Sequence, residues 1–342
     1  MLSYFKENSL SLNLSKSGYL IINGKVEDCK CNLILHNGIL EYKSVLKYLG
    51  IKISDTGNLK NDIDLYVNEK RSNVSIKYSN FCRKNFLAPL NVKITVLNSC
   101  VSTSLTYACE TWGVSSIKKV EAAFRQGLKT ALSIRDCVNN EIVYVESGEW
   151  PLELRITKQQ LKFWLTITDI TEQRPDHYIS KLVRAADNTA YVKFYKNLAT
   201  TFTETKKCVN ILKNTFKTRF DSKIRDSARD DEDSKLGAYL LVNPTLSKPL
   251  FEDKLEFQRV LITRYRTGSH NLRIEKDRRF PNSTRNDRIC KCSNGIQTVK
   301  HVILQCSLLN HIREKYNVID ITNGIFNENF LLEMECILGI KR

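Results

Sequence analysis

Apolar residues recur along the chain with two different periods, and the change between them falls near residue 55. From residue 20 to 54, short runs rich in Ile, Leu, Val and Tyr end at Gly, Asn or Ser, which is typical of β-strands. Asn23-Gly24 and Asn37-Gly38 are strong hairpin signals, because both residue types tolerate positive φ. We predict a small β element built from YLIING, KCNLILHNG and SVLKYLGIKIS.

Beyond residue 55, apolar residues lie three or four positions apart, which is the spacing of amphipathic helices. This spacing predicts helices over 62–84, 92–112, 116–134 and 153–169, and a group of helices between 175 and 229. Pro89 separates the first two, because proline bars helix continuation. In the third helix one apolar stripe is formed by Ile117, Val120, Phe124, Leu128 and Leu132.

These patterns divide the chain into four regions and predict an α+β, mainly α, fold. A β-rich region spans 1–55 and a first helical region spans 56–145. A second helical region, 146–250, contains a charged stretch near 226–236 that we expect to be an exposed linker. The last region, 251–342, joins an Arg-rich segment to a cysteine cluster and a helical tail.

Charge indicates what this architecture binds. The chain has 53 Lys and Arg against 37 Asp and Glu, a net charge of +16. A polyanion is the first partner to expect, and nucleic acid is the commonest one. A basic protein without such a partner remains the alternative. We expect no membrane partner, because the longest uncharged run, 94–109, is too short and too polar to span a bilayer.

The eleven cysteines favour an intracellular, reducing compartment, cytoplasmic or nuclear. No secretory signal opens the sequence, and an odd cysteine count does not suit a disulfide framework. Single cysteines among apolar residues are usually core residues. Five are expected there: Cys82, Cys100, Cys109, Cys137 and Cys208.

Three further cysteines and one histidine gather within seventeen residues: Cys290, Cys292, His301 and Cys306. Four such ligands suit tetrahedral zinc, so we predict a structural zinc site. The Cys-x-Cys spacing is short, and His301 and Cys306 would lie roughly 140° apart on an ideal α-helix. Cys306 is therefore expected at the end of a helix. The alternative is three unliganded thiols beside an ordinary histidine.

Two groups of basic residues are candidates for nucleic-acid contact, because arginine pairs bidentately with phosphate. The first group is Arg264, Arg266, His270, Arg273, Arg278 and Arg279. The second, on the helix over 62–84, is Lys70, Arg71 and Lys77. A solvated basic surface is the alternative for both groups. For the arginines, internal pairing with Glu275 and Asp277 is a further alternative.

Several stretches, taken in order, resemble the reverse transcriptases of non-LTR (LINE-type) retrotransposons. SLSLNLSKSGYLII resembles the strand entry after the catalytic loop of the palm, and SLTYACETWG resembles a thumb helix. LKYLGIKIS, with Tyr48, Leu49 and Gly50, resembles the palm-to-thumb strand near the primer. ESGEWPLELRITKQQLKFW is similar to the segment after the thumb, and the Arg-rich stretch with its Cys-Cys-His-Cys cluster resembles the family's C-terminal knuckle.

The resemblance implies a palm remnant over 1–55, a thumb over 56–145, a connection over 146–250 and a zinc-knuckle module over 251–342. It also implies RNA or DNA as partners, together with the fingers and catalytic palm. The family's metal-binding carboxylates, which hold two Mg²⁺ ions, would precede this sequence. Asp230-Asp231, the one Asp-Asp pair, lies in a polar run without a strand. We therefore expect no catalytic residue here, and Mg²⁺ only in the full-length parent enzyme.

Two rival interpretations belong to other classes. One is a host-recruited, zinc-dependent nucleic-acid-binding protein, and the other is a non-functional pseudogene product. A free-standing nuclease is the weakest alternative, because no compact constellation of Asp, Glu and Lys lies on predicted strands.

Overall fold

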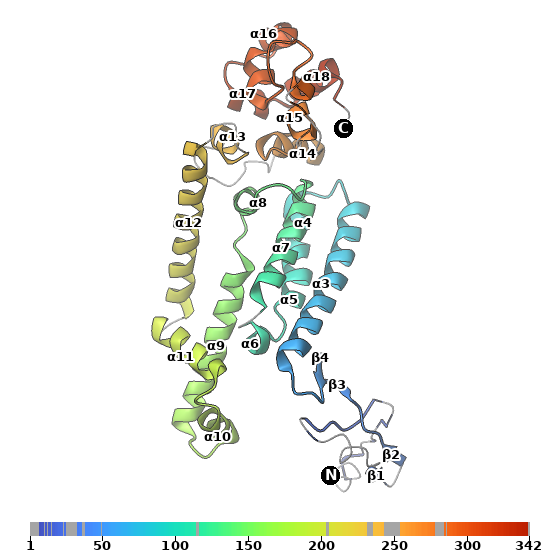
Figure 1. Cartoon of the computed structure of the whole chain (residues 1–342), viewed down its shortest axis with the longest axis vertical. Helices are drawn as coiled ribbons and strands as arrows, with labels where there is room; N and C mark the ends of the chain where they lie inside the picture. Colours follow the sequence, from blue (N-terminus) through green and yellow to red (C-terminus); the bar gives the residue numbers. More distant parts are fainter. Residues whose placement is uncertain are drawn as a thin grey trace.

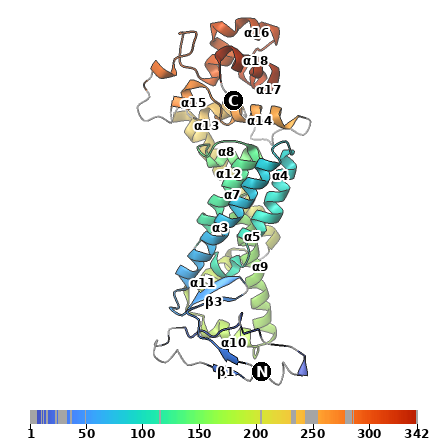
Figure 2. The same cartoon turned by 90° about the vertical axis from the view of Figure 1, so that its right-hand side faces the viewer.

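The computed structural model describes residues 7–9, 11, 13–14, 16–22, 24, 33–35, 38–48, 50–113, 116–202, 205–230, 235–242, 254–277, 284 and 286–340. Short strands lie at one end, long helices in the middle and a small helical module at the other end (Figure 1). Figure 2 shows the same elongated arrangement from the side. The predicted α+β, mainly α, class is confirmed. Among the described helices, none is long and apolar enough to cross a membrane.

The β element consists of two antiparallel strand pairs. β1 (Leu33–Leu35) pairs with β2 (Gly38–Leu40), and β3 (Val45–Tyr48) pairs with β4 (Ile51–Ser54). The expected strand over YLIING is not formed in the described residues, where Tyr19 makes only an isolated bridge to Tyr42. Asn23 and Asn37 of the predicted turns lie outside the described residues.

The first long helix, α3 (Leu59–Lys84), ends at the residue where the pattern predicts its end. Its N-cap is Asn58, whose side chain accepts a hydrogen bond from the backbone N–H of Asn61. Asp62, in the first turn of the helix, is buried. Its carboxylate accepts hydrogen bonds from the backbone N–H and the hydroxyl of Ser54, both at 2.9 Å. Asp62 therefore fixes the end of β4 against the start of α3.

The predicted continuous helix over 92–112 is wrong. It is divided into α4 (Leu90–Val96), the π-helix η1 (Leu97–Ser102), α5 (Thr103–Leu105) and α6 (Cys109–Trp112). The last break contains Ala108 at φ 56°. Hydroxyl side chains that donate to the carbonyl four residues earlier bend helices. Four do so in this stretch: Thr95, Ser99, Thr103 and Thr106.

The bundle is completed by α7 (Ile117–Leu132), α8 (Asn140–Ser147) and α9 (Leu152–Gln173). The predicted stripe of α7 faces the core: Val120, Phe124, Leu128 and Leu132 are buried, and Ile117 packs against them. The sequence pattern did not single out α8, which has only eight residues.

Helices also fill the region between 175 and 229, as predicted. They are α10 (Tyr178–Ala185), α11 (Ala190–Thr201) and α12 (Thr205–Asp230), and α13 (Lys235–Val242) follows. The stretch near 226–236, expected to be a linker, is therefore helical at both ends, with 231–234 outside the described residues. α12 packs along the bundle through Phe220, whose ring stacks on Tyr144 at 5.8 Å.

The C-terminal module has a core of its own, in which Ile262, Val302, Phe330 and Met334 are fully buried. Its α-helices are α14 (Glu256–Arg266), α15 (Arg273–Asp277), α16 (Asn310–Lys315), α17 (Ile321–Phe326) and α18 (Glu328–Leu338). Between them lie the 3-10 helices η2 (Asn286–Arg288) and η4 (Ser307–Leu309), and the π-helix η3 (His301–Gln305).

The five cysteines expected in the core divide into two groups. Cys82, Cys109 and Cys208 are buried, as predicted. Cys100 and Cys137 are exposed, because Cys100 lies on the outer side of η1 and Cys137 lies in the connection between α7 and α8.

A substitution at Gly113, which follows the last residue of α6, tests how tightly the bundle is packed. A Cβ atom there would lie 2.5 Å from the carbonyl oxygen of Cys109 and 2.6 Å from Nε2 of Gln160. We expect Gly113→Ala to lower the free energy of unfolding by about 1–3 kcal/mol, as overpacking does. Urea denaturation measures this, with Ser79→Ala on the exposed side of α3 as the control. An unchanged denaturation midpoint for Gly113→Ala would contradict the packing described.

Candidate metal centre and basic surfaces

The first two cysteines of the cluster lie on a tight chain reversal. Ile289 and Ile296 form an antiparallel bridge, and the N–H of Cys290 donates to the carbonyl of Gly295 at 2.7 Å. Within the turn, Ser293 adopts φ 63° and its N–H donates to the carbonyl of Cys290 at 2.9 Å. This reversal brings both thiols into one cluster, although a single residue separates them.

The other two residues are placed by a π-helical turn. The N–H of Cys306 donates to the carbonyl of His301 at 2.8 Å, a bond across five residues that defines the π-helix. Cys306 then leaves the helix in an extended conformation, at φ −68° and ψ 118°. The prediction that Cys306 lies at a helix end is confirmed. On an ideal α-helix His301 and Cys306 would lie roughly 140° apart, but the wider turn of the π-helix lets both side chains reach the same cluster.

The four side chains converge on one point in the module. Their ligand atoms all lie within 4.8 Å of one another. The two Sγ atoms of Cys290 and Cys306 are 3.7 Å apart, and Sγ of Cys292 is 3.2 Å from Nε2 of His301. Three of the four residues are buried, and Cys292 is half-buried. The cluster can therefore hold one metal ion within the module's core.

The surroundings set the protonation of these groups. Burial, together with the neighbouring Cys290 thiol, raises the pKa of Cys306 to about 12. Burial also acts to raise the pKa of Cys292, but hydrogen bonds from the Asn294 backbone and nearby thiols leave it lowered. Burial and the Arg313 guanidinium lower the pKa of His301. A neutral imidazole is the metal-binding form, and a bound cation deprotonates coordinating thiols.

Arg266 and His270, expected to contact nucleic acid, lie inside the protein instead. Each is only 4% exposed. The Nη2 and Nε atoms of Arg266 donate to Oε1 of Glu146 at 2.7 and 3.0 Å, and His270 stacks on Tyr265. The prediction that these two residues contact nucleic acid is therefore wrong, because a buried side chain with a partner inside the protein cannot reach a phosphate. Internal pairing was one of the alternatives, but the partner is Glu146 on α8.

The remaining arginines of the stretch are placed differently. Arg273 is half-buried: its backbone N–H donates to Gln297, and its Nη1 donates to the carbonyl of Ile289 at 2.7 Å. It therefore supports the turn that carries the first two cysteines. Arg264 is half-buried at the edge of α14. Arg278 and Arg279 lie outside the described residues.

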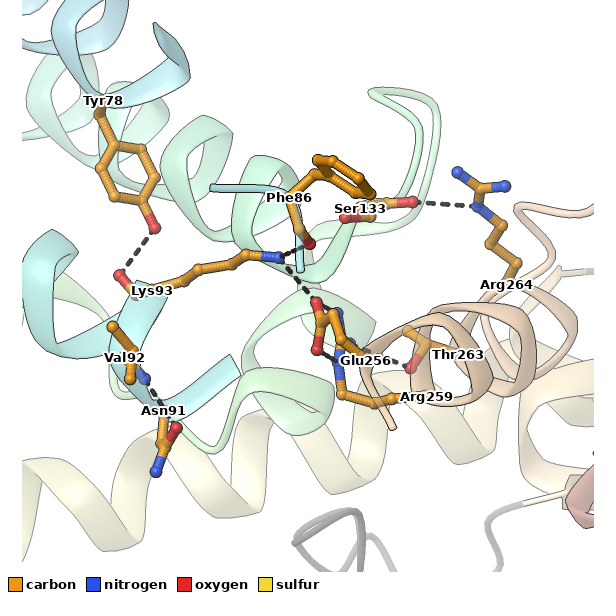
Figure 3. A network of polar contacts seen from close by, with 10 residues as sticks. All are labelled: Tyr78, Phe86, Asn91, Val92, Lys93, Ser133, Glu256, Arg259, Thr263 and Arg264. Atoms are coloured by element: carbon orange, nitrogen blue, oxygen red, sulfur yellow. Dashed lines mark hydrogen bonds and ion pairs between the residues drawn. The ribbon is translucent and has the colours of Figure 1, made fainter. Parts of the chain in front are cut away.

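A buried ionic network joins the C-terminal module to the bundle (Figure 3). Nζ of Lys93 on α4 donates to Glu256 on α14 at 2.7 Å and to the carbonyl of Phe86 at 2.9 Å. Arg259 donates to both oxygens of the same carboxylate, each at 2.7 Å. Lys93 and Arg259 are 1% and 2% exposed. Sequence reasoning missed this network, whose only local signal is a lysine within the apolar run LNVKITVL.

The basic candidates on α3 are more accessible. Lys77 is exposed, and Lys70 is half-buried, with its Nζ near the rings of Tyr66 and Tyr107 at 5.6 and 5.8 Å. Arg71 is half-buried, and its Nε has no hydrogen-bond partner among the described residues.

Tyr48 and Gly50 of the Tyr-Leu-Gly stretch lie at the turn between β3 and β4. Tyr48, 64% exposed, ends β3, and Gly50 adopts φ 88°. Leu49 lies outside the described residues.

Comparison of the chain with protein-family models, curated proteins and solved structures finds no match. The resemblance to LINE-type reverse transcriptases therefore stays a prediction, and function has to be inferred from the sites themselves.

The Arg266–Glu146 pair gives a test of the junction. Burial raises the pKa of Glu146, and Arg266 acts in the opposite direction. Arg266→Met removes the cation from this buried carboxylate, to which the Tyr239 hydroxyl still donates at 2.9 Å, so we expect a loss of about 3–5 kcal/mol at neutral pH. The folded-state pKa then rises further above the ordinary value of 4.5. The loss is therefore smaller near pH 4.5 and grows as pH rises through the folded pKa.

Urea denaturation at both pH values measures this effect. The matched control is the double variant Arg266→Met, Glu146→Leu, which removes both charges and should lose less stability than Arg266→Met alone. Equal losses in the single and double variants at neutral pH would show that the pair is not coupled.

Proposed function

We propose that the chain binds nucleic acid, that one structural zinc ion organises its C-terminal module, and that it represents the thumb and C-terminal region of a LINE-type reverse transcriptase. The observation that carries the proposal is the convergence of Cys290, Cys292, His301 and Cys306 inside this module. Three thiolates and an imidazole are a common donor set of structural zinc sites.

The geometry suits zinc in particular. Zn–S bonds of about 2.3 Å in a tetrahedron place two sulfur atoms about 3.8 Å apart, and the Sγ atoms of Cys290 and Cys306 are 3.7 Å apart. Outer hydrogen bonds orient metal ligands, and Nε2 of Gln297 lies 3.9 Å from Sγ of Cys290. Gln297 also receives the backbone N–H of Arg273, which ties the cluster to the Arg-rich stretch.

Nucleic-acid binding is supported by the net charge of +16 and by the exposed basic residues of α3. Lys77, Arg83 and Lys84 are exposed on the second half of this helix, and the last two form part of its final turn. Helical basic residues with this placement can follow a phosphate backbone. The arginines of the Arg-rich stretch contribute less than expected, because Arg266 is buried.

The strand pairs support a further protein portion as a partner. A two-stranded hairpin is marginally stable by itself, and here apolar side chains are exposed on both pairs: Ile34 at 84%, Ile39 at 51% and Val45 at 50%. In the proposed parent enzyme, a catalytic palm with its Mg²⁺ ions would cover them. This chain would then hold the template and primer, without polymerising alone.

Metal content tests the zinc site. We expect about one zinc per chain in purified protein, and its loss in the double variant Cys290→Ser, Cys306→Ser. The control is Cys100→Ser, Cys336→Ser, which removes two exposed thiols outside the cluster and should keep the metal. Unchanged zinc in the first variant would exclude these residues as ligands.

The salt dependence of binding tests the nucleic-acid interface on α3. Each phosphate contact contributes about 0.7–0.9 to the slope of log K against log salt. The triple variant Lys77→Gln, Arg83→Gln, Lys84→Gln should therefore lower that slope by about 2–3. The charge-matched control is Lys181→Gln, Arg184→Gln, Lys193→Gln, on the exposed surface of α10 and α11. An equal change in both variants would mean that α3 is not the interface.

A further inference from the structure

A cavity of about 330 Å³ opens where the bundle meets the C-terminal module. It is lined by Phe86 and Leu87, in the connection between α3 and α4, and by Phe257 and Arg264 of α14. Tyr265 and Glu335 also line it. The cavity is separate from the metal cluster, since none of the four ligands lines it.

Large apolar side chains are exposed at its rim. Phe86 is 66% exposed, Leu87 61% and Phe257 52%. Exposed apolar groups gathered around a concavity mark binding sites more often than isolated ones do. Phe86 is held in place, because its carbonyl accepts the hydrogen bond from buried Lys93 (Figure 3). The rim thus carries two exposed aromatic rings, Phe86 and Phe257, and the backbone of Phe86 is anchored by Lys93.

Basic groups outnumber acidic ones at this cavity: Lys93, Arg259 and Arg264 lie at or beside it, against Glu256 and Glu335. Nε of Arg264 donates to the carbonyl of Ser133 at 3.2 Å (Figure 3). Among the described residues its two Nη atoms have no partner in a hydrogen bond or ion pair. Glu256 pairs with Lys93 and Arg259. Glu335 accepts a hydrogen bond from the neutral hydroxyl of Tyr265 at 3.0 Å and keeps its charge.

We propose that this cavity takes an unpaired base of a single-stranded nucleic acid, stacked against Phe86 and Phe257, while Arg264 pairs with the neighbouring phosphate. Aromatic rings beside a free guanidinium are the groups that bind single strands, because every base offers a π-face and every linkage a charge. A base in a duplex is already stacked and paired, so the site selects single strands. This inference rests on the proposed nucleic-acid binding and assigns a ligand to one place on the molecule.

The test is fluorescence anisotropy with a labelled single-stranded oligonucleotide and a duplex of the same sequence, over the same series of salt concentrations. Phe86→Ala and Phe257→Ala should each weaken single-strand binding by about 5-fold to 150-fold and leave duplex binding unchanged. Arg264→Gln should weaken single-strand binding and lower its salt slope by about 0.7. The control is Tyr178→Ala, an aromatic residue 66% exposed on α10, which should change neither. Both phenylalanines are exposed, so these variants should fold, and thermal melts verify it.

Three outcomes overturn the inference, and they differ in what they say of nucleic-acid binding. If the wild type binds and the phenylalanine variants bind single strands as tightly, the cavity is not the site, whereas the proposed function stands. If single-strand and duplex binding fall together, the rim contributes no base stacking. If the wild type binds neither ligand at any salt concentration, the proposed function fails as well, and an apolar peptide becomes the occupant to test.

Discussion

The structure depends on buried charge at the junction between the bundle and the C-terminal module. Lys93, Glu256 and Arg259 form one ionic cluster there, and Arg266 with Glu146 forms a second pair. Burying such ions costs several kcal/mol each unless their partners are in place with good geometry. The module therefore has little freedom to dock in another orientation, since any shift would leave a cation or a carboxylate unpaired. This specificity, more than added stability, is the consequence of the network.

The metal cluster has a complementary role within the module. Helices α14 to α18 surround an apolar core, and Cys290 and Cys306 are part of it. Small modules commonly depend on a metal to fix their loops, and the hairpin with the first two cysteines contains a single β-bridge. Arg273 joins that hairpin to the stretch after α14. The junction thus orients the module, and the cluster orients the hairpin within it.

Local patterns predicted much of the fold. The apolar stripe of α7 and the end of α3 at Lys84 follow from spacing and helix signals that lie within the segment. The four residues of the Cys-Cys-His-Cys cluster were also found from sequence, because metal-binding residue types gathered within a short stretch are rare by chance. The broken helix over 92–112 was missed, because apolar spacing does not show where the backbone changes to a π-helix or to the left-handed conformation of Ala108. The junction was missed because Lys93 and Glu256 are far apart in the sequence.

The Arg-rich stretch shows why charge counted along a sequence does not map a binding surface. Arginine is suited to phosphate and to buried carboxylate for the same reason, a planar fork of donors that is always charged. Only the position of the carboxylate decides between these uses, and Glu146 lies on a helix 120 residues earlier. Arg266 is therefore buried at its partner Glu146, while Arg264, two residues before it, is half-buried and lines the cavity at the junction. One turn of α14 thus carries both a structural and an accessible arginine, and the buried one holds the helix that presents the other.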